Sequence, residues 1–232
     1  MTETTDETFR FVDLTRMGKE RYKATNRRGG VLPVGSGDDP DFTPVELLLA
    51  ALAGCAAVDI DLITGKRVDP TTFEMRTTGH KVRDEQGSHL VDLTRMGKER
   101  YKATNRRGGV LPISSGDDPD FSPVELLLAA LAGCAAVDID LITGKRVEPT
   151  TFEMRTTGHK VRDEQGSHLV GLTIHLDVRF PEGEDGDRAR AMLPRAIQQT
   201  RDRLCTVGRT VALGEPVEYV EEDLSALEIS RR

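Results

Sequence analysis

Three cysteines are the residues best suited to chemistry in this chain: Cys55, Cys134 and Cys205. An odd number of cysteines, without a signal-peptide pattern at the N-terminus, does not predict a structural disulfide framework. No two of them form a CxxC pair, and none has a histidine near it at zinc-ligand spacing. The sequence therefore indicates no metal site and no cofactor. It leaves two interpretations, reactive thiols in a reducing compartment or plain buried cysteines.

Cys55 and Cys134 each lie in the same apolar segment, Pro-Val-Glu-Leu-Leu-Leu-Ala-Ala-Leu-Ala-Gly-Cys, which occurs twice. This segment predicts a buried central helix that begins with a capping box and has proline at its first position. The cap and its carboxylate are Thr43 and Glu46 in the first segment, and Ser122 and Glu125 in the second. A cysteine on such a helix packs well as a small core residue, so the pattern alone leaves its role open.

Cys205 has a different environment, at the end of a second predicted helix that spans residues 184–204. Its neighbours are small or polar, and Arg203 and Arg209 flank it. Cations near a thiol favour the thiolate, so this position suits a reactive cysteine better than a core one. A core or neutral surface cysteine is the alternative.

These helices belong to a tandem duplication. Residues 12–90 recur as residues 91–169, an offset of 79, and residues 170–232 occur once. The copies differ at four positions: Val34/Ile113, Gly35/Ser114, Thr43/Ser122 and Asp69/Glu148. Residues 91–232 contain every element once, so we expect them to form a complete domain. Residues 1–90 are then a duplicated N-terminal half that docks on a second chain, exchanges elements with the second copy, or stays partly disordered.

The patterning predicts an α+β fold. Alternation of apolar and polar residues predicts strands, and the strongest case is 170–180, which should form a hairpin with 151–161. The helix over 184–204 is expected to bend or restart at Pro194. The remaining predictions are strands within 8–23, 30–34, 72–82 and 210–221, and a helix over 44–63.

Composition is that of a soluble globular protein, with 37% hydrophobic and 31% charged residues and a net charge of −7. No run of eighteen or more apolar residues is present, so no membrane-spanning helix is expected. Basic residues stand in small groups diluted by acids, which argues against a nucleic-acid partner. We expect a cytoplasmic protein.

Together, the Pro-x-Glu-Leu-Leu helix ending in Ala-Gly-Cys134 and the later Leu-Cys205-Thr-Val-Gly-Arg-Thr segment resemble the OsmC/Ohr superfamily of hydroperoxide reductases, most of all its actinobacterial OsmC-like proteins. The resemblance covers residues 91–232 and is repeated over residues 12–90. It implies an α+β fold in which antiparallel sheets enclose two central helices and two subunits interlock as a homodimer. It also implies a thiol-dependent peroxidase that reduces organic hydroperoxides in stress defence.

In that scheme Cys134 is the peroxidatic thiol and Cys205 resolves its sulfenic acid as a disulfide, which a dihydrolipoamide-like dithiol then reduces. The resemblance also implies an arginine that keeps the thiol ionised and a glutamate that holds this arginine. The glutamate position directly after the helix proline is Val124 here, so Glu125, one residue later, is the candidate. The arginine is Arg100, Arg95, Arg106 or Arg107, and Arg100 is favoured.

The first copy offers a possible duplicate site, Cys55, Glu46 and Arg21, which has no resolving cysteine of its own. Thr206 also stands where many family members have proline. These departures keep a second hypothesis open, in which the chain is a non-catalytic module that binds an apolar small ligand and its cysteines are structural.

Overall fold

The computed structural model describes residues 6–64, 66, 70–80, 88–115, 118–145, 147–164, 166–221 and 224. The elements in chain order are β1 (Phe9–Gly18), β2 (Arg21–Asn26), β3 (Val31–Val34), α1 (Pro44–Thr64), β4 (Glu74–His80), β5 (Ser88–Gly97), β6 (Arg100–Asn105), β7 (Val110–Ser114), α2 (Pro123–Thr143), β8 (Thr151–Asp163), β9 (Gly166–Arg179), α3 (Glu184–Gln199), the π-helical turn η1 (Thr200–Leu204) and α4 (Thr206–Leu213).

Two antiparallel sheets form, and each contains strands from both copies. The five-stranded sheet has the order β3-β2-β1-β8-β9, and the four-stranded sheet has the order β4-β5-β6-β7. The strands of the first copy therefore join the β8–β9 hairpin of the second. In return, β4 of the first copy pairs with β5 of the second.

The two sheets repeat the same register. In the larger sheet Val12 lies opposite Thr156, and in the smaller one Val91 lies opposite Thr77. Val91 and Val12 differ by the repeat offset of 79, and so do Thr156 and Thr77. In the smaller sheet β5 is therefore equivalent to β1, and β4 is equivalent to β8. Nearly identical sequences thus form two equivalent layers, and the chain crosses from one layer to the other between its strands and its helix.

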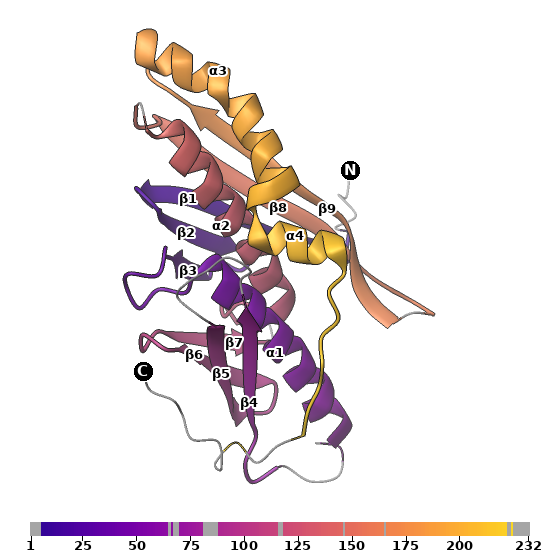
Figure 1. Ribbon diagram of the computed structural model, residues 1–232. Coiled ribbons are helices and arrows are strands. Elements are labelled where there is room, and N and C mark those ends of the chain that lie inside the picture. Colours follow the sequence, from indigo (N-terminus) through magenta and orange to yellow (C-terminus); the bar gives the residue numbers. More distant parts are fainter. Residues whose placement is uncertain are drawn as a thin grey trace.

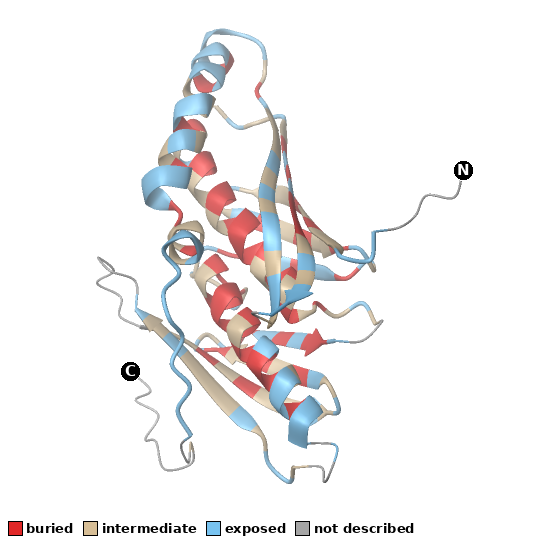
Figure 2. Cartoon of the chain, turned by 90° about the vertical axis from the view of Figure 1, so that its right-hand side faces the viewer, coloured by how far each residue is buried: buried red, intermediate tan, exposed pale blue. Residues whose placement is uncertain are grey.

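Each sheet is covered by the helix of the other copy, so that α2 packs on β1, β2 and β8 while α1 packs on β4, β5 and β6 (Figure 1). On β1 and β5, the side chains that face the helices are fully buried: Val12, Leu14, Val91 and Leu93. Alanine-rich faces let α1 and α2 contact each other where they meet, and Figure 2 shows buried residues along both helices. The core is therefore continuous across both layers.

Of the three arrangements considered for residues 1–90, the structure shows the exchange of elements with the second copy. The boundary at residue 90 falls inside β5, and whether residues 91–232 fold as a complete domain on their own stays a prediction. The hairpin of 151–161 with 170–180 is confirmed. The strand predicted over 72–82 is confirmed as β4, with residues 81 and 82 outside the described ranges.

Two predictions near the C-terminus need correction. The strand expected over 210–221 is wrong, because Thr206–Leu213 forms α4, which ends at Gly214 with φ of 65°, and residues 215–221 have no regular structure. Alternating Val211 and Leu213 gave the strand signal, but Cys205 caps a helix there. The helix over 184–204 does not restart at Pro194; it runs to Gln199 and changes to the π-helical turn at Thr200.

The smaller layer is incomplete, because β9, α3, η1 and α4 occur once: β9 pairs with β8, and the three helical segments pack mainly on α2. The C-terminal end of α1 is correspondingly exposed at Ile60, Leu62 and Ile63. By length and hydropathy alone α1 and α2 would each qualify to cross a membrane. However, 56% and 72% of their most apolar windows are buried inside the molecule, as in core helices of globular proteins.

Candidate functional site

Folding brings Cys134 and Cys205 together, although 71 positions separate them in the chain. Their sulfurs lie within 4.8 Å of each other and of a carboxylate oxygen of Asp138. The Cys134 thiol donates a hydrogen bond to the Cys205 sulfur. Cys134 is half-buried and Cys205 is buried, so solvent reaches the pair from the Cys134 side.

Cys205 is positioned by an irregular segment between two helices. The π-helical turn at Thr200–Leu204 ends where the Cys205 amide donates to the Thr200 carbonyl oxygen at 3.0 Å. Cys205 then becomes the N-cap of α4, and its sulfur accepts a hydrogen bond from the Gly208 amide at 3.2 Å. π-Helical turns often occur at functional sites, and this one places a thiol at a helix N-terminus facing α2.

The two thiols differ in acidity. The hydrogen bond from Cys134 lowers the pKa of Cys205, burial opposes this, and the Gly208 amide lowers it further. The same bond raises the pKa of Cys134, because its proton is held between the sulfurs, and burial raises it again. Of the two thiols, Cys205 is therefore the one that ionises first as the pH rises.

Cys55 occupies the position equivalent to Cys134, but no second thiol meets it. Cys55 is exposed on α1, and the segment that carries Cys205 packs mainly on α2. The possible duplicate site of Cys55, Glu46 and Arg21 therefore has no resolving cysteine beside Cys55 and stays a prediction.

Glu125 and Glu46 hold arginines, but across the copies. The Glu125 carboxylate caps Ser122 and accepts two hydrogen bonds from Arg28, at 3.0 and 2.7 Å. The Glu46 carboxylate caps Thr43 and accepts two from Arg107, at 2.8 and 2.7 Å. Both carboxylates are buried, so each pair is a desolvated, bidentate contact that fastens the strands of one copy to the helix of the other.

Arg28 was not among the expected site residues, whereas Arg107, its equivalent, was one of four candidates. The favoured Arg100 does not contact Glu125; it is exposed and donates to Asp118 at 2.6 Å. It lies on β6, in the sheet that covers α1. Arg21, on β2 in the sheet that covers α2, pairs with Asp39 and Asp41. An activating role for Arg100 stays a prediction.

A second carboxylate on each helix fastens a hairpin of the other copy. Asp61 on α1 accepts from Arg95 at 3.0 Å, from the Glu99 amide at 3.0 Å and from the Tyr101 hydroxyl at 3.1 Å. Burial opposes ionisation of Asp61, but these hydrogen bonds outweigh it and lower its pKa. Asp140 on α2 makes the equivalent contacts with Arg16, Glu20 and Tyr22.

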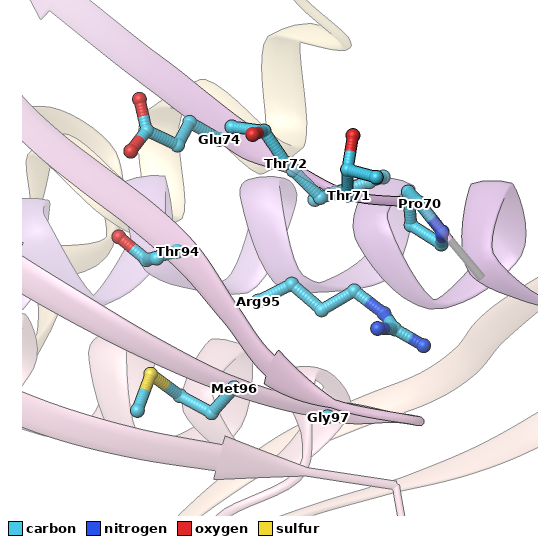
Figure 3. Close-up of a pocket in the computed structure, with 9 residues that line it drawn as sticks. Pro70, Thr71, Thr72, Glu74, Thr94, Arg95, Met96 and Gly97 are labelled. Carbon is cyan, nitrogen blue, oxygen red and sulfur yellow. The ribbon is translucent and has the colours of Figure 1, made fainter.

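A hollow of about 260 Å³ lies at the ends of β4 and β5, away from the thiol pair (Figure 3). Its walls include Thr71, Thr72, Glu74, Thr94 and Arg95, so most of its lining is polar. Such a lining does not match the apolar ligand of the second hypothesis, because apolar ligands bind in mainly hydrophobic pockets.

Comparison with known proteins gives a consistent assignment. The family model described as OsmC-like protein matches residues 35–103 and again residues 116–220. Uncharacterised proteins of Mycobacterium tuberculosis and Mycobacterium bovis are 30% identical over 136 residues, which covers 58% of this chain and 96% of theirs. A solved structure described as an OsmC-like hydroperoxide resistance protein from Jannaschia sp. CCS1 is 15% identical, with a TM-score of 0.32 over 67% of this chain and 95% of that one.

Proposed function

From the chain's place in the OsmC-like protein family, to which it belongs, we propose that it is a cytoplasmic thiol-dependent peroxidase that reduces organic hydroperoxides. Cys134 is the peroxidatic residue and Cys205 the resolving residue. The observation that carries the proposal is the contact between the two sulfurs, which lie within 4.8 Å of each other. A small movement brings two such sulfurs to the 2.05 Å of a disulfide.

The difference in acidity gives Cys205 a further part in the reaction. Cys134 is the more accessible sulfur, and the Cys205 sulfur lies close enough to receive the proton of its thiol. Cys205 therefore accepts this proton as the peroxide approaches, and the Cys134 thiolate attacks the outer peroxide oxygen. The O–O bond breaks, the alkoxide takes the proton that Cys205 had accepted and leaves as the alcohol, Cys205 is a thiolate again, and Cys134 becomes a sulfenic acid.

Resolution follows from the same geometry. The Cys205 thiolate attacks the Cys134 sulfur, the disulfide forms, and hydroxide leaves and is protonated to water. An external dithiol, dihydrolipoamide-like in the proposal, reduces the disulfide by thiol exchange and is itself oxidised. One peroxide and one dithiol thus give one alcohol, one water and one oxidised dithiol.

The test is consumption of cumene hydroperoxide by the full chain with a dithiol reductant. Cys134→Ser should lose turnover, and Cys205→Ser should lose disulfide formation and most turnover, because the sulfenic acid then has no partner. Cys55→Ser is the matched control and should retain full activity, since the same segment on α1 meets no second thiol. Turnover that persists in Cys134→Ser contradicts the proposal.

A further inference from the structure

The thiol pair has a third neighbour that the proposed reaction does not use. Asp138 stands four residues after Cys134 on α2, and side chains at this spacing share one helix face. Its carboxylate oxygen and the two sulfurs all lie within 4.8 Å of one another. We propose that Cys134, Asp138 and Cys205 form a binding site for one thiophilic divalent cation, of which Zn²⁺ is the representative.

The donor set decides the class of ion. Two cysteine sulfurs and one carboxylate oxygen suit zinc, which binds both ligand types in tetrahedral geometry, whereas magnesium and calcium require oxygen ligands. With Zn–S bonds of about 2.3 Å, neighbouring sulfurs in a tetrahedral site are about 3.8 Å apart. The donors lie within 4.8 Å of one another, so closing by about 1 Å at most completes the site. Three protein ligands leave a fourth position for water or a small ligand.

The three donors come from two elements that are already held in place. Cys134 and Asp138 lie on the buried helix α2, whose first turn is fixed by the Glu125 capping box. Cys205 is held by the hydrogen bonds of its own amide and sulfur at the junction of η1 and α4. A cation therefore binds without reorganising the chain, and its charge compensates three groups that are anionic together when the thiols ionise.

The first copy supplies an internal control. Cys55 and Asp59 repeat Cys134 and Asp138 at the same spacing on α1, but nothing equivalent to Cys205 reaches them, because α4 packs mainly on α2. Two donors on one exposed helix face bind a cation far more weakly than three. The chain should therefore bind one ion, not two.

Metal binding and disulfide formation exclude each other, because both use the same two sulfurs. An ion on the reduced pair protects it from peroxide, and oxidation to the disulfide releases the ion. The site would thus couple the amount of free thiophilic metal to the redox state of the pair. This coupling concerns the proposed peroxidase, but the binding site itself does not depend on that activity.

Cobalt provides the direct test, because thiolate ligands give Co²⁺ an intense near-ultraviolet charge-transfer absorption. The fully reduced chain should bind one Co²⁺ with this absorption, and Zn²⁺ should displace it in competition with a chromophoric chelator. Asp138→Asn, which preserves the side-chain shape, and Cys205→Ser should each weaken binding by more than the roughly 10- to 100-fold cost of losing an outer-shell partner. Asp59→Asn and Cys55→Ser should leave the affinity unchanged.

Three results would overturn the site: equal affinity in Asp138→Asn, charge-transfer absorption that persists in Cys205→Ser, or equal losses in Asp138→Asn and Asp59→Asn. The peroxide-oxidised chain must also fail to bind Co²⁺. The titrations of the reduced chain and its variants are performed without peroxide. Failure of metal binding therefore leaves the peroxidase proposal standing, and an inactive chain that binds one ion leaves the metal site standing.

Discussion

Two hydrogen bonds to the Cys205 sulfur lower its pKa, and substitution can remove one while keeping the other. The Cys134 thiol and the Gly208 amide both donate to its sulfur and lower its pKa. Gly208 can approach this closely because it has no side chain, since a Cβ there would lie 3.2 Å from the Cys205 sulfur. Removing the thiol donor leaves burial, which raises the pKa by more than the Gly208 amide lowers it, so the lowering of the pKa should be lost.

Cys134→Ala should therefore raise the pKa of Cys205 to its ordinary value or above, because burial then outweighs the Gly208 amide. The measurement is the pH dependence of alkylation at Cys205, followed by mass spectrometry with a chelator present to keep the pair free of metal. In Cys55→Ala the profile should equal that of the unchanged chain. A Cys205 profile that does not move in Cys134→Ala would show that the sulfur–sulfur hydrogen bond has no part in its ionisation.

Sequence motifs are enough to identify Cys134 and Cys205 as a pair, but not to find their surroundings. Asp138 gives a signal in the sequence, since it follows Cys134 by four residues on a predicted helix, yet only the arrival of Cys205 makes that spacing meaningful. Arg28 gives no such signal in the sequence, because its partner Glu125 lies 97 positions away, in the other copy. Local patterns describe a helix face well and give little information about which distant segment covers it.

At the scale of elements, buried carboxylates fasten each helix to a hairpin of the other copy. The ionised form of Asp61 is favoured in the folded state, because three hydrogen bonds lower its pKa below the ordinary 3.8. Its contribution to stability is therefore present above about pH 4 and is lost as the pH falls through the lowered folded-state pKa.

Asp61→Asn should lower the free energy of unfolding by about 3 kcal/mol at pH 7, because Arg95 loses its buried partner. The difference from the unchanged chain should shrink below pH 4, where Asp61 becomes protonated. Urea denaturation at pH 7 and pH 3 measures both effects. Asp59→Asn, on the exposed face of the same helix, is the control and should change little. An equal difference at both pH values contradicts this account.

Element types were largely predictable, because capping boxes and alternating apolar residues are local signals. The exceptions have physical causes. The helix of Thr206–Leu213 begins from the Cys205 cap rather than from an apolar pattern, and it overrides the alternation that predicted a strand. Pairing between copies could not be predicted at all, because the sequences of β1 and β5 are nearly the same and either could lie beside β8.

At the scale of the whole molecule, the crossing of elements makes the duplicated half indispensable to this arrangement. Residues 115–122 lead from β7, in the four-stranded sheet, directly to α2, which covers the five-stranded sheet. A chain with one copy would have α2, β8 and β9 but would lack the strands β1–β3 that complete the sheet under α2. Those strands would have to come from a second chain.

Deleting residues 12–90, which leaves 153 residues, should therefore give a dimer in which two chains exchange their strands. Each such dimer should contain two Cys134–Cys205 pairs, against one in the full chain. Sedimentation over a wide concentration range measures the mass, which should stay that of a dimer on dilution. A folded monomer would contradict the crossing. Homodimerisation of the full chain is a separate prediction and is not decided by this experiment.

The crossing also governs when the molecule can fold during its synthesis. The first three strands and α1 leave the ribosome early, but α1 packs on β5 of the second copy and β1 pairs with β8, more than 130 residues later. At roughly 5–20 residues per second this leaves apolar surface uncovered for several seconds or more. In return, the two copies of the finished fold cannot separate without unpairing β1 from β8 and β4 from β5.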